Sequence, residues 1–150
     1  MKATSPRFAV WLGIAAVLIH GTPLVLHGLA HAQLGIYLQS VLANIYIAVV
    51  LYLAPVVAAG LLWMGRMRSG GWLLLGSMLG SLIFEAYNHY LAMSPDHVSQ
   101  VPAGTWGDIF RMTAMASVIT EVLASAAALL IISTPRPAMS TRATEGPSVQ

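Results

Sequence analysis

The sequence contains no cysteine, and only 8% of its 150 residues are charged. Without cysteine the chain can form neither disulfide bonds nor thiolate metal sites, and cysteine usage gives no information about its compartment. So little charge excludes an ordinary soluble domain, in which about a quarter of the residues are charged. The net charge of +2 is also too small and too scattered for a protein that binds nucleic acid.

Hydrophobic residues make up 57% of the chain and form four long runs, at residues 8–29, 41–64, 72–93 and 112–133. Each run can cross a bilayer, because a transmembrane helix needs about 20 mainly apolar residues. The sequence therefore predicts an all-α integral membrane domain over residues 1–133, an antiparallel four-transmembrane-helix bundle in contact with the lipid bilayer. Residues 134–150, rich in Pro, Ser and Thr, are predicted to form a disordered cytoplasmic tail.

The positive charges predict the orientation of these spans. Six of the seven cationic side chains fall before the first run, between the second and third runs, or in the tail: Lys2, Arg7, Arg66, Arg68, Arg136 and Arg142. Because Lys and Arg concentrate on the cytoplasmic side, both termini are predicted to be cytoplasmic, and all five histidines lie in the outer half. We expect a multi-pass protein of a bacterial-type inner (plasma) membrane.

A secretory signal peptide is an alternative interpretation of the first run. The basic residues Lys2 and Arg7, the apolar core over residues 8–19, and the small residues Ala30 and Ala32 imitate a signal sequence with a cleavage site. The apolar stretch continues well beyond that core, which favours an uncleaved span.

Ionisable residues inside the runs are the strongest indication of a functional site, because such groups are costly in a bilayer and usually face a bundle interior or a ligand. His20, His27 and His31 follow one another at intervals of seven and four residues, which places them on one stripe of a helix. Glu85 and His89 are one helical turn apart. At about 1.5 Å per residue, we expect His20, Glu85 and Glu121 near the bilayer centre and His27 with His89 in a shallower layer.

Imidazole and carboxylate side chains in this arrangement predict a site for a transition metal, used in redox or metal-handling chemistry. The predicted ligands are His20, His27, Glu85, His89 and Glu121. Secondary candidates are His31, Asn44, Asn88, Met93, Asp96, His97, Met112 and Met115. Copper is slightly favoured over iron and zinc, because the three methionines cluster at the same outer ends and thioether ligands suit copper.

Three other interpretations remain open at this stage. His27 and His89, at matching depth on different helices, could ligate a b-type haem. A chain of His and Glu groups could instead serve proton or quinone chemistry without a metal. The protein could also be a non-catalytic accessory subunit that docks in a larger membrane complex or a homo-oligomer, with Glu85 and Glu121 as neutral acids joining helices. No enzyme class, catalytic residue or substrate is indicated.

Overall fold

The computed structural model describes residues 5–37 and 40–134, and all regular structure in these two ranges is helical. The elements are α1 (Pro6–Leu34), α2 (Val41–Tyr46), the π-helix η1 (Ile47–Leu53), α3 (Ala54–Trp63), α4 (Met67–Ala86), the π-helix η2 (Tyr87–Leu91) and α5 (Thr105–Ile132). Because α2, η1 and α3 are continuous and η2 extends α4, this part of the chain forms four long helices. All four are long and apolar enough to cross a membrane, as the sequence predicts.

Three of the four long helices exceed their predicted spans, and the second matches its span closely. The third begins at Met67 instead of residue 72, and the fourth at Thr105 instead of residue 112. Gly70 and Gly71 do not break the third helix, because both are buried where neighbouring helices approach closely. The fourth begins directly after Gly104, a glycine with a φ of 124° at the end of the preceding loop. Its first turn carries Asp108, and a negative charge is favoured at this end of a helix. The predicted tail lies outside the described residues beyond Thr134.

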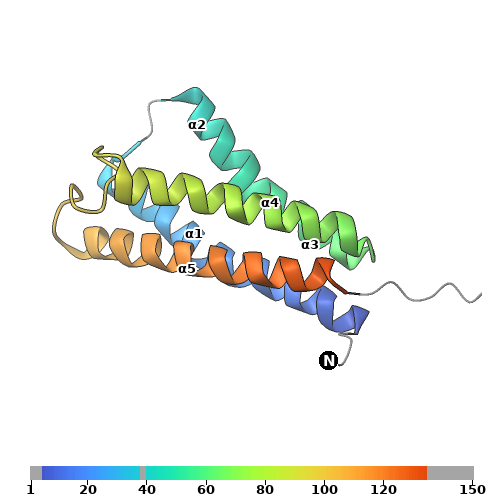
Figure 1. Ribbon diagram of the computed structural model, residues 1–150. Coiled ribbons are helices and arrows are strands. Elements are labelled where there is room, and N and C mark those ends of the chain that lie inside the picture. The colour runs from blue at the N-terminus through green and yellow to red at the C-terminus, as the bar shows by residue number, and fades with distance from the viewer. Residues whose placement is uncertain (1–4, 38–39, 135–150) are drawn as a thin grey trace, which may run out of the picture.

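The arrangement of the helices leaves one of them partly detached (Figure 1). α5 lies lengthwise against both α1 and α4, and α3 packs against α4. α2 diverges from the others in Figure 1, and none of its residues is buried. The end of α1, η2, the loop of residues 92–104 and the start of α5 meet at one end of the bundle, which we call the histidine end.

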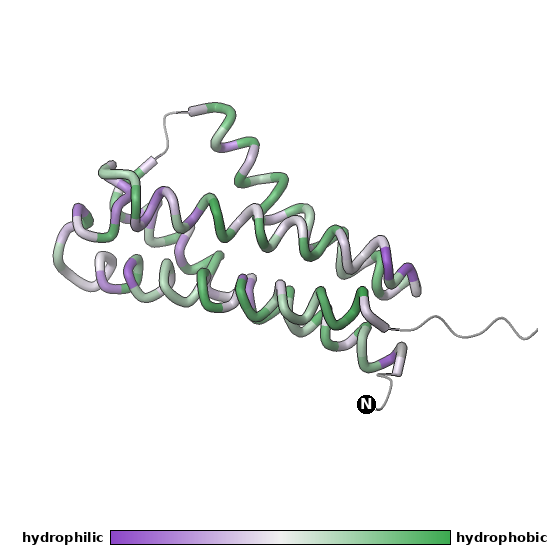
Figure 2. Tube along the Cα trace, viewed as in Figure 1, coloured by the Kyte–Doolittle hydropathy of each residue, from purple (hydrophilic) through white to green (hydrophobic). Residues whose placement is uncertain are grey.

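Hydrophobic residues are distributed along all the long helices (Figure 2). Toward the end opposite the histidines, the core is built on Leu62, Leu74, Met78 and Ile131, all at most 1% exposed. A smaller cluster of Ala30, Val101 and Phe110 closes the histidine end. Many large apolar side chains are more than half exposed on the outer faces, which is expected of helices that contact lipid.

Candidate metal centre

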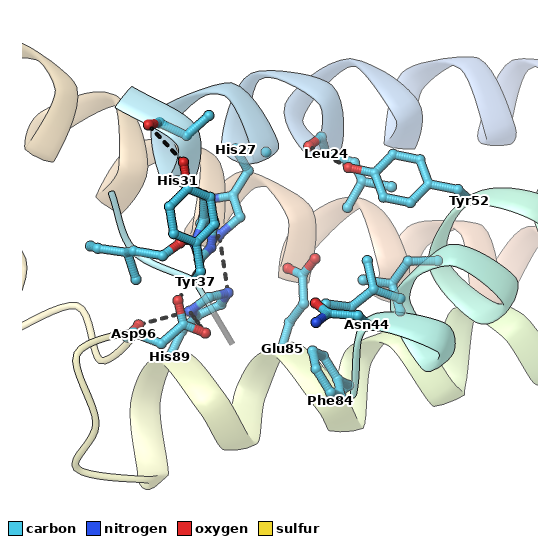
Figure 3. Close-up of a pocket in the computed structure, with 15 residues that line it drawn as sticks. Leu24, His27, His31, Tyr37, Asn44, Tyr52, Phe84, Glu85, His89 and Asp96 are labelled. Atoms are coloured by element: carbon cyan, nitrogen blue, oxygen red, sulfur yellow. Dashed lines mark hydrogen bonds and ion pairs between the residues drawn. The ribbon is translucent and has the colours of Figure 1, made fainter. Parts of the chain in front are cut away.

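Three imidazoles meet at the histidine end (Figure 3). His27 and His31 lie one turn apart on α1, and His89 comes from η2. Their ligand nitrogens all lie within 4.8 Å of one another. The Nε2 atom of His27 is 3.1 Å from Nε2 of His89 and 3.0 Å from Nε2 of His31. We call these three residues the histidine triad.

The outer nitrogen of each ring faces a hydrogen-bond acceptor. Nδ1 of His31 lies 3.0 Å from the carbonyl oxygen of Ile36, and Nδ1 of His89 lies 2.9 Å from the carbonyl oxygen of Asp96. Nδ1 of His27 is 3.0 Å from the hydroxyl of Thr113, which itself donates to the Ile109 carbonyl oxygen at 2.7 Å. Because each of these oxygens accepts, we assign the ring hydrogen to Nδ1 in all three histidines.

This assignment leaves the Nε2 lone pair of His27 facing the Nε2 lone pairs of both His31 and His89. A single proton on His31 Nε2 would satisfy its contact with His27, but His27 and His89 would still present two lone pairs to each other at 3.1 Å. A cation between the three nitrogens removes that repulsion. Nitrogens bound tetrahedrally to zinc at 2.0–2.1 Å lie about 3.4 Å apart, so the rings need to separate by only a few tenths of an ångström.

Asp96 adds a carboxylate to this centre. Its side chain is almost fully buried, with one oxygen 3.2 Å from His31 Nε2 and the other 3.6 Å from His89 Nδ1. The loop of residues 92–104 folds back over the helix ends and places it there. Arg111 holds that loop, because its guanidinium donates to the carbonyl oxygens of Val98 and Val101 at 3.2 and 2.6 Å. The centre therefore offers three nitrogens and an oxygen.

Two residues around the triad were absent from the sequence-based candidates. Phe110 is fully buried, and its ring lies 4.5–5.3 Å, centre to centre, from all three imidazoles, so it excludes water on that side. Thr113 orients His27. Thr113, Ser117 and Glu121 recur every four residues along α5, and this spacing was a signal that could have placed Thr113 on the site face.

The deeper predicted ligands lie outside the triad. His20, Glu85 and Glu121 are at most 2% exposed, so their prediction as buried groups is confirmed. Nδ1 of His20 contacts the hydroxyl of Thr120 at 3.3 Å, and Ser81 donates to Glu121 Oε1. The remaining polar atom of each deep residue, Nε2 of His20 and Oε2 of both glutamates, has no hydrogen-bond partner. Their role as metal ligands stays a prediction.

The secondary candidates separate into two groups. His31 and Asp96 belong to the centre, and Asn44 lines a cavity that the triad also lines. Asn88 donates to the Phe84 carbonyl oxygen of its own helix at 2.8 Å, and His97 contacts the Tyr90 carbonyl oxygen and Ser99. The three methionines do not join the triad, because the side chains of Met93, Met112 and Met115 are at least half exposed. The observation that favoured copper therefore has no counterpart at the centre.

The geometry does not favour haem between His27 and His89. Two axial nitrogens would lie on opposite faces of a porphyrin, whereas these nitrogens are 3.1 Å apart with His31 and Phe110 packed against both rings. Arg111, the cationic side chain at this end, binds the loop and pairs with Asp108 at 3.1 Å.

No family model, curated protein sequence or solved structure matches this chain. The centre is therefore interpreted from its own geometry.

Proposed function

We propose that this protein binds a divalent transition metal within the membrane through His27, His31 and His89, for redox or metal-handling chemistry. The observation that carries the proposal is the convergence of three Nε2 atoms, each freed for a metal because Nδ1 of the same ring donates to an oxygen acceptor. Such outer hydrogen bonds are typical of metal-bound histidine. Asp96 supplies a fourth ligand or a negative charge beside the metal.

Zinc and iron suit this donor set at least as well as copper. Three imidazoles and a carboxylate are nitrogen and oxygen ligands of intermediate hardness, and no thioether is part of the described centre. Ligation by the three histidines alone leaves a coordination position, as in catalytic metal sites. The metal would act there as a Lewis acid or an electron carrier.

The proposal includes the topology that the sequence predicts. In an antiparallel bundle with cytoplasmic termini, the histidine end faces the outside of a bacterial-type inner membrane. The metal would then be loaded from the outer side, beneath the loop of residues 92–104. A docking subunit without a metal is the competing proposal.

Metal analysis of the purified protein tests the proposal. We expect about one zinc, iron or copper ion per chain after purification without chelator, and a large loss of metal in both His27→Ala and His89→Ala. Replacement by Co²⁺ should give the visible absorption of a tetrahedral site. His97→Ala is the matched control, because His97 lies at the same end of the molecule but outside the triad.

The double variant Glu85→Gln/Glu121→Gln separates the triad from the deeper ligands that the sequence predicts. We expect it to keep the metal, because neither glutamate belongs to the triad, and to fold, because an amide oxygen still accepts from Ser81. Loss of metal in this variant would assign the deeper residues as ligands. Wild-type protein that binds none of the three metals would overturn the proposed function.

A further inference from the structure

Two adjoining cavities lie along α1 and the second long helix, and residues of α4, η2 and the loop of residues 92–104 also line one of them. The first, of about 210 Å³, is lined by the histidine triad and by Asp96, Asn44 and Glu85 (Figure 3). The second, of about 560 Å³, follows α1, η1 and α3 and is lined mainly by apolar side chains. Leu24, Leu51 and Tyr52 line both, so the two cavities adjoin. We call the first the head cavity and the second the chain groove.

The chain groove faces lipid. Its walls belong to the first two membrane-spanning helices, and α2 diverges from the bundle beside the head cavity. The chain groove is lined by helix residues alone, and it adjoins the head cavity. A ligand can therefore reach both cavities from the hydrocarbon region of the bilayer, which selects compounds that dissolve in lipid.

The charges that line the head cavity restrict the polar group that a bound ligand can carry. No Lys or Arg lines either of these cavities, whereas the carboxyl groups of Glu85 and Asp96 line the first. Glu85 is 2% exposed, and its Oε2 atom has no hydrogen-bond partner. The side chains give a phosphate or carboxylate head no cationic partner, and the two carboxylates offset the charge of a divalent metal at the triad. An uncharged hydroxyl group needs no counter-charge and would donate to the carboxyl group of Glu85 at the cavity wall.

Size and wall chemistry restrict the ligand further. Tyr37, Tyr52 and Phe84 line the head cavity, and aromatic walls suit a planar ring. At about 210 Å³ this cavity is smaller than the roughly 300 Å³ of a typical whole-ligand site. It can hold a ring, but a longer apolar chain must lie in the adjoining groove.

We infer that the protein binds an uncharged quinol-type amphiphile, with its hydroxylated ring in the head cavity beside Glu85 and the triad and its apolar chain in the groove. The inference rests on the proposed function, because it gives that metal centre a substrate class. Gly21 offers a direct test. It lines the groove, and a Cβ atom added there would meet no atom within 4 Å, so a larger side chain fills the groove without a clash at its base.

The experiment uses full-length protein in lipid nanodiscs and a benzoquinol whose alkyl chain carries a photoreactive diazirine. We expect saturable labelling of α1 and the η1–α3 segment, and binding at least about tenfold weaker in Gly21→Phe. Gly76→Phe is the matched control with unchanged binding. Gly76 is likewise a helical glycine with no atom near its added Cβ, but it lines neither cavity.

Probes with the same chain but another head identify other occupants. Equal labelling by a probe without hydroxyl groups would mean that lipid chains fill the groove, and tighter binding of a carboxylate head would contradict the charge argument. Either result, or wild-type binding by Gly21→Phe, overturns the inference. Metal content is measured on the same samples. Metal without saturable quinol binding refutes only this inference, whereas quinol binding without metal refutes only the proposed function.

Discussion

Asp96 reaches the centre through both its backbone and its side chain. Its carbonyl oxygen accepts from His89 Nδ1 at 2.9 Å, and one carboxylate oxygen lies 3.2 Å from His31 Nε2. These contacts have different consequences on substitution. A side-chain change removes the charge beside the triad but leaves the backbone contact that orients His89.

Asp96→Asn should therefore weaken metal binding without abolishing it. We expect the affinity for Zn²⁺, measured by competition with a chelator, to fall by about 10–100-fold. The control is Asp108→Asn, since the Asp108 side chain is 70% exposed and pairs with Arg111. Equal affinities in wild type and Asp96→Asn would exclude the carboxylate from the centre.

Two glycines of α4, Gly70 and Gly76, lie on different faces of the helix, one in contact with α3 and one exposed. A Cβ atom at Gly70 would lie 2.8 Å from Cγ of Leu62 and 3.0 Å from the carbonyl oxygen of Ala58, so α3 can approach α4 there only because the side chain is absent. An added Cβ at Gly76 would meet no atom within 4 Å. The same residue type therefore permits close packing at one position and only lowers helix propensity at the other.

We expect opposite effects of alanine at these two positions. Gly70→Ala should lower the free energy of unfolding by about 1–3 kcal/mol, because α3 must move or Leu62 must change rotamer. Gly76→Ala should raise it by up to about 1 kcal/mol through helix propensity. Unfolding in mixed detergent micelles, followed by circular dichroism, measures both. A stable Gly70→Ala variant would contradict the close α3–α4 contact.

On the scale of the whole molecule, polar groups are unevenly distributed. The triad, Asp96 and the loop that Arg111 holds all lie at the histidine end, whereas Arg66 and Arg68 flank the turn between α3 and α4 at the other end. The position of the centre relative to the two sides of the membrane therefore follows directly from the orientation of the bundle.

The absence of cysteine makes that orientation directly measurable. In intact cells, Ser99→Cys should react with a membrane-impermeant maleimide, and Ser69→Cys should react only after permeabilisation, because positive charge marks the cytoplasmic side. Both serines are exposed. The reverse pattern would invert the proposed topology. A mature mass that begins at Gln33 would support signal cleavage, which removes two members of the triad.

The sequence by itself determined the helical spans and the helix faces that carry ionisable groups. Long apolar runs can satisfy their backbone in lipid only as helices or closed barrels, and their length here suits helices, so composition predicts the elements. The spacing of His20, His27 and His31 follows from the helical repeat. The boundaries at Met67 and Thr105 were missed, because glycine at a helix contact and polar residues at a helix end look like a break in hydropathy.

Only the tertiary structure decided which of these groups meet. His31 and Asp96 joined the centre because a loop folds back onto α1, and a fold-back depends on contacts such as those of Arg111 that no spacing rule encodes. The three methionines point outward for a similar reason, since hydrophobicity does not distinguish a lipid-facing from an inward-facing position. Whether Nε2 of each ring carries a free lone pair depends on the acceptor that faces Nδ1, and those acceptors come from α5, the residues just after α1 and the loop.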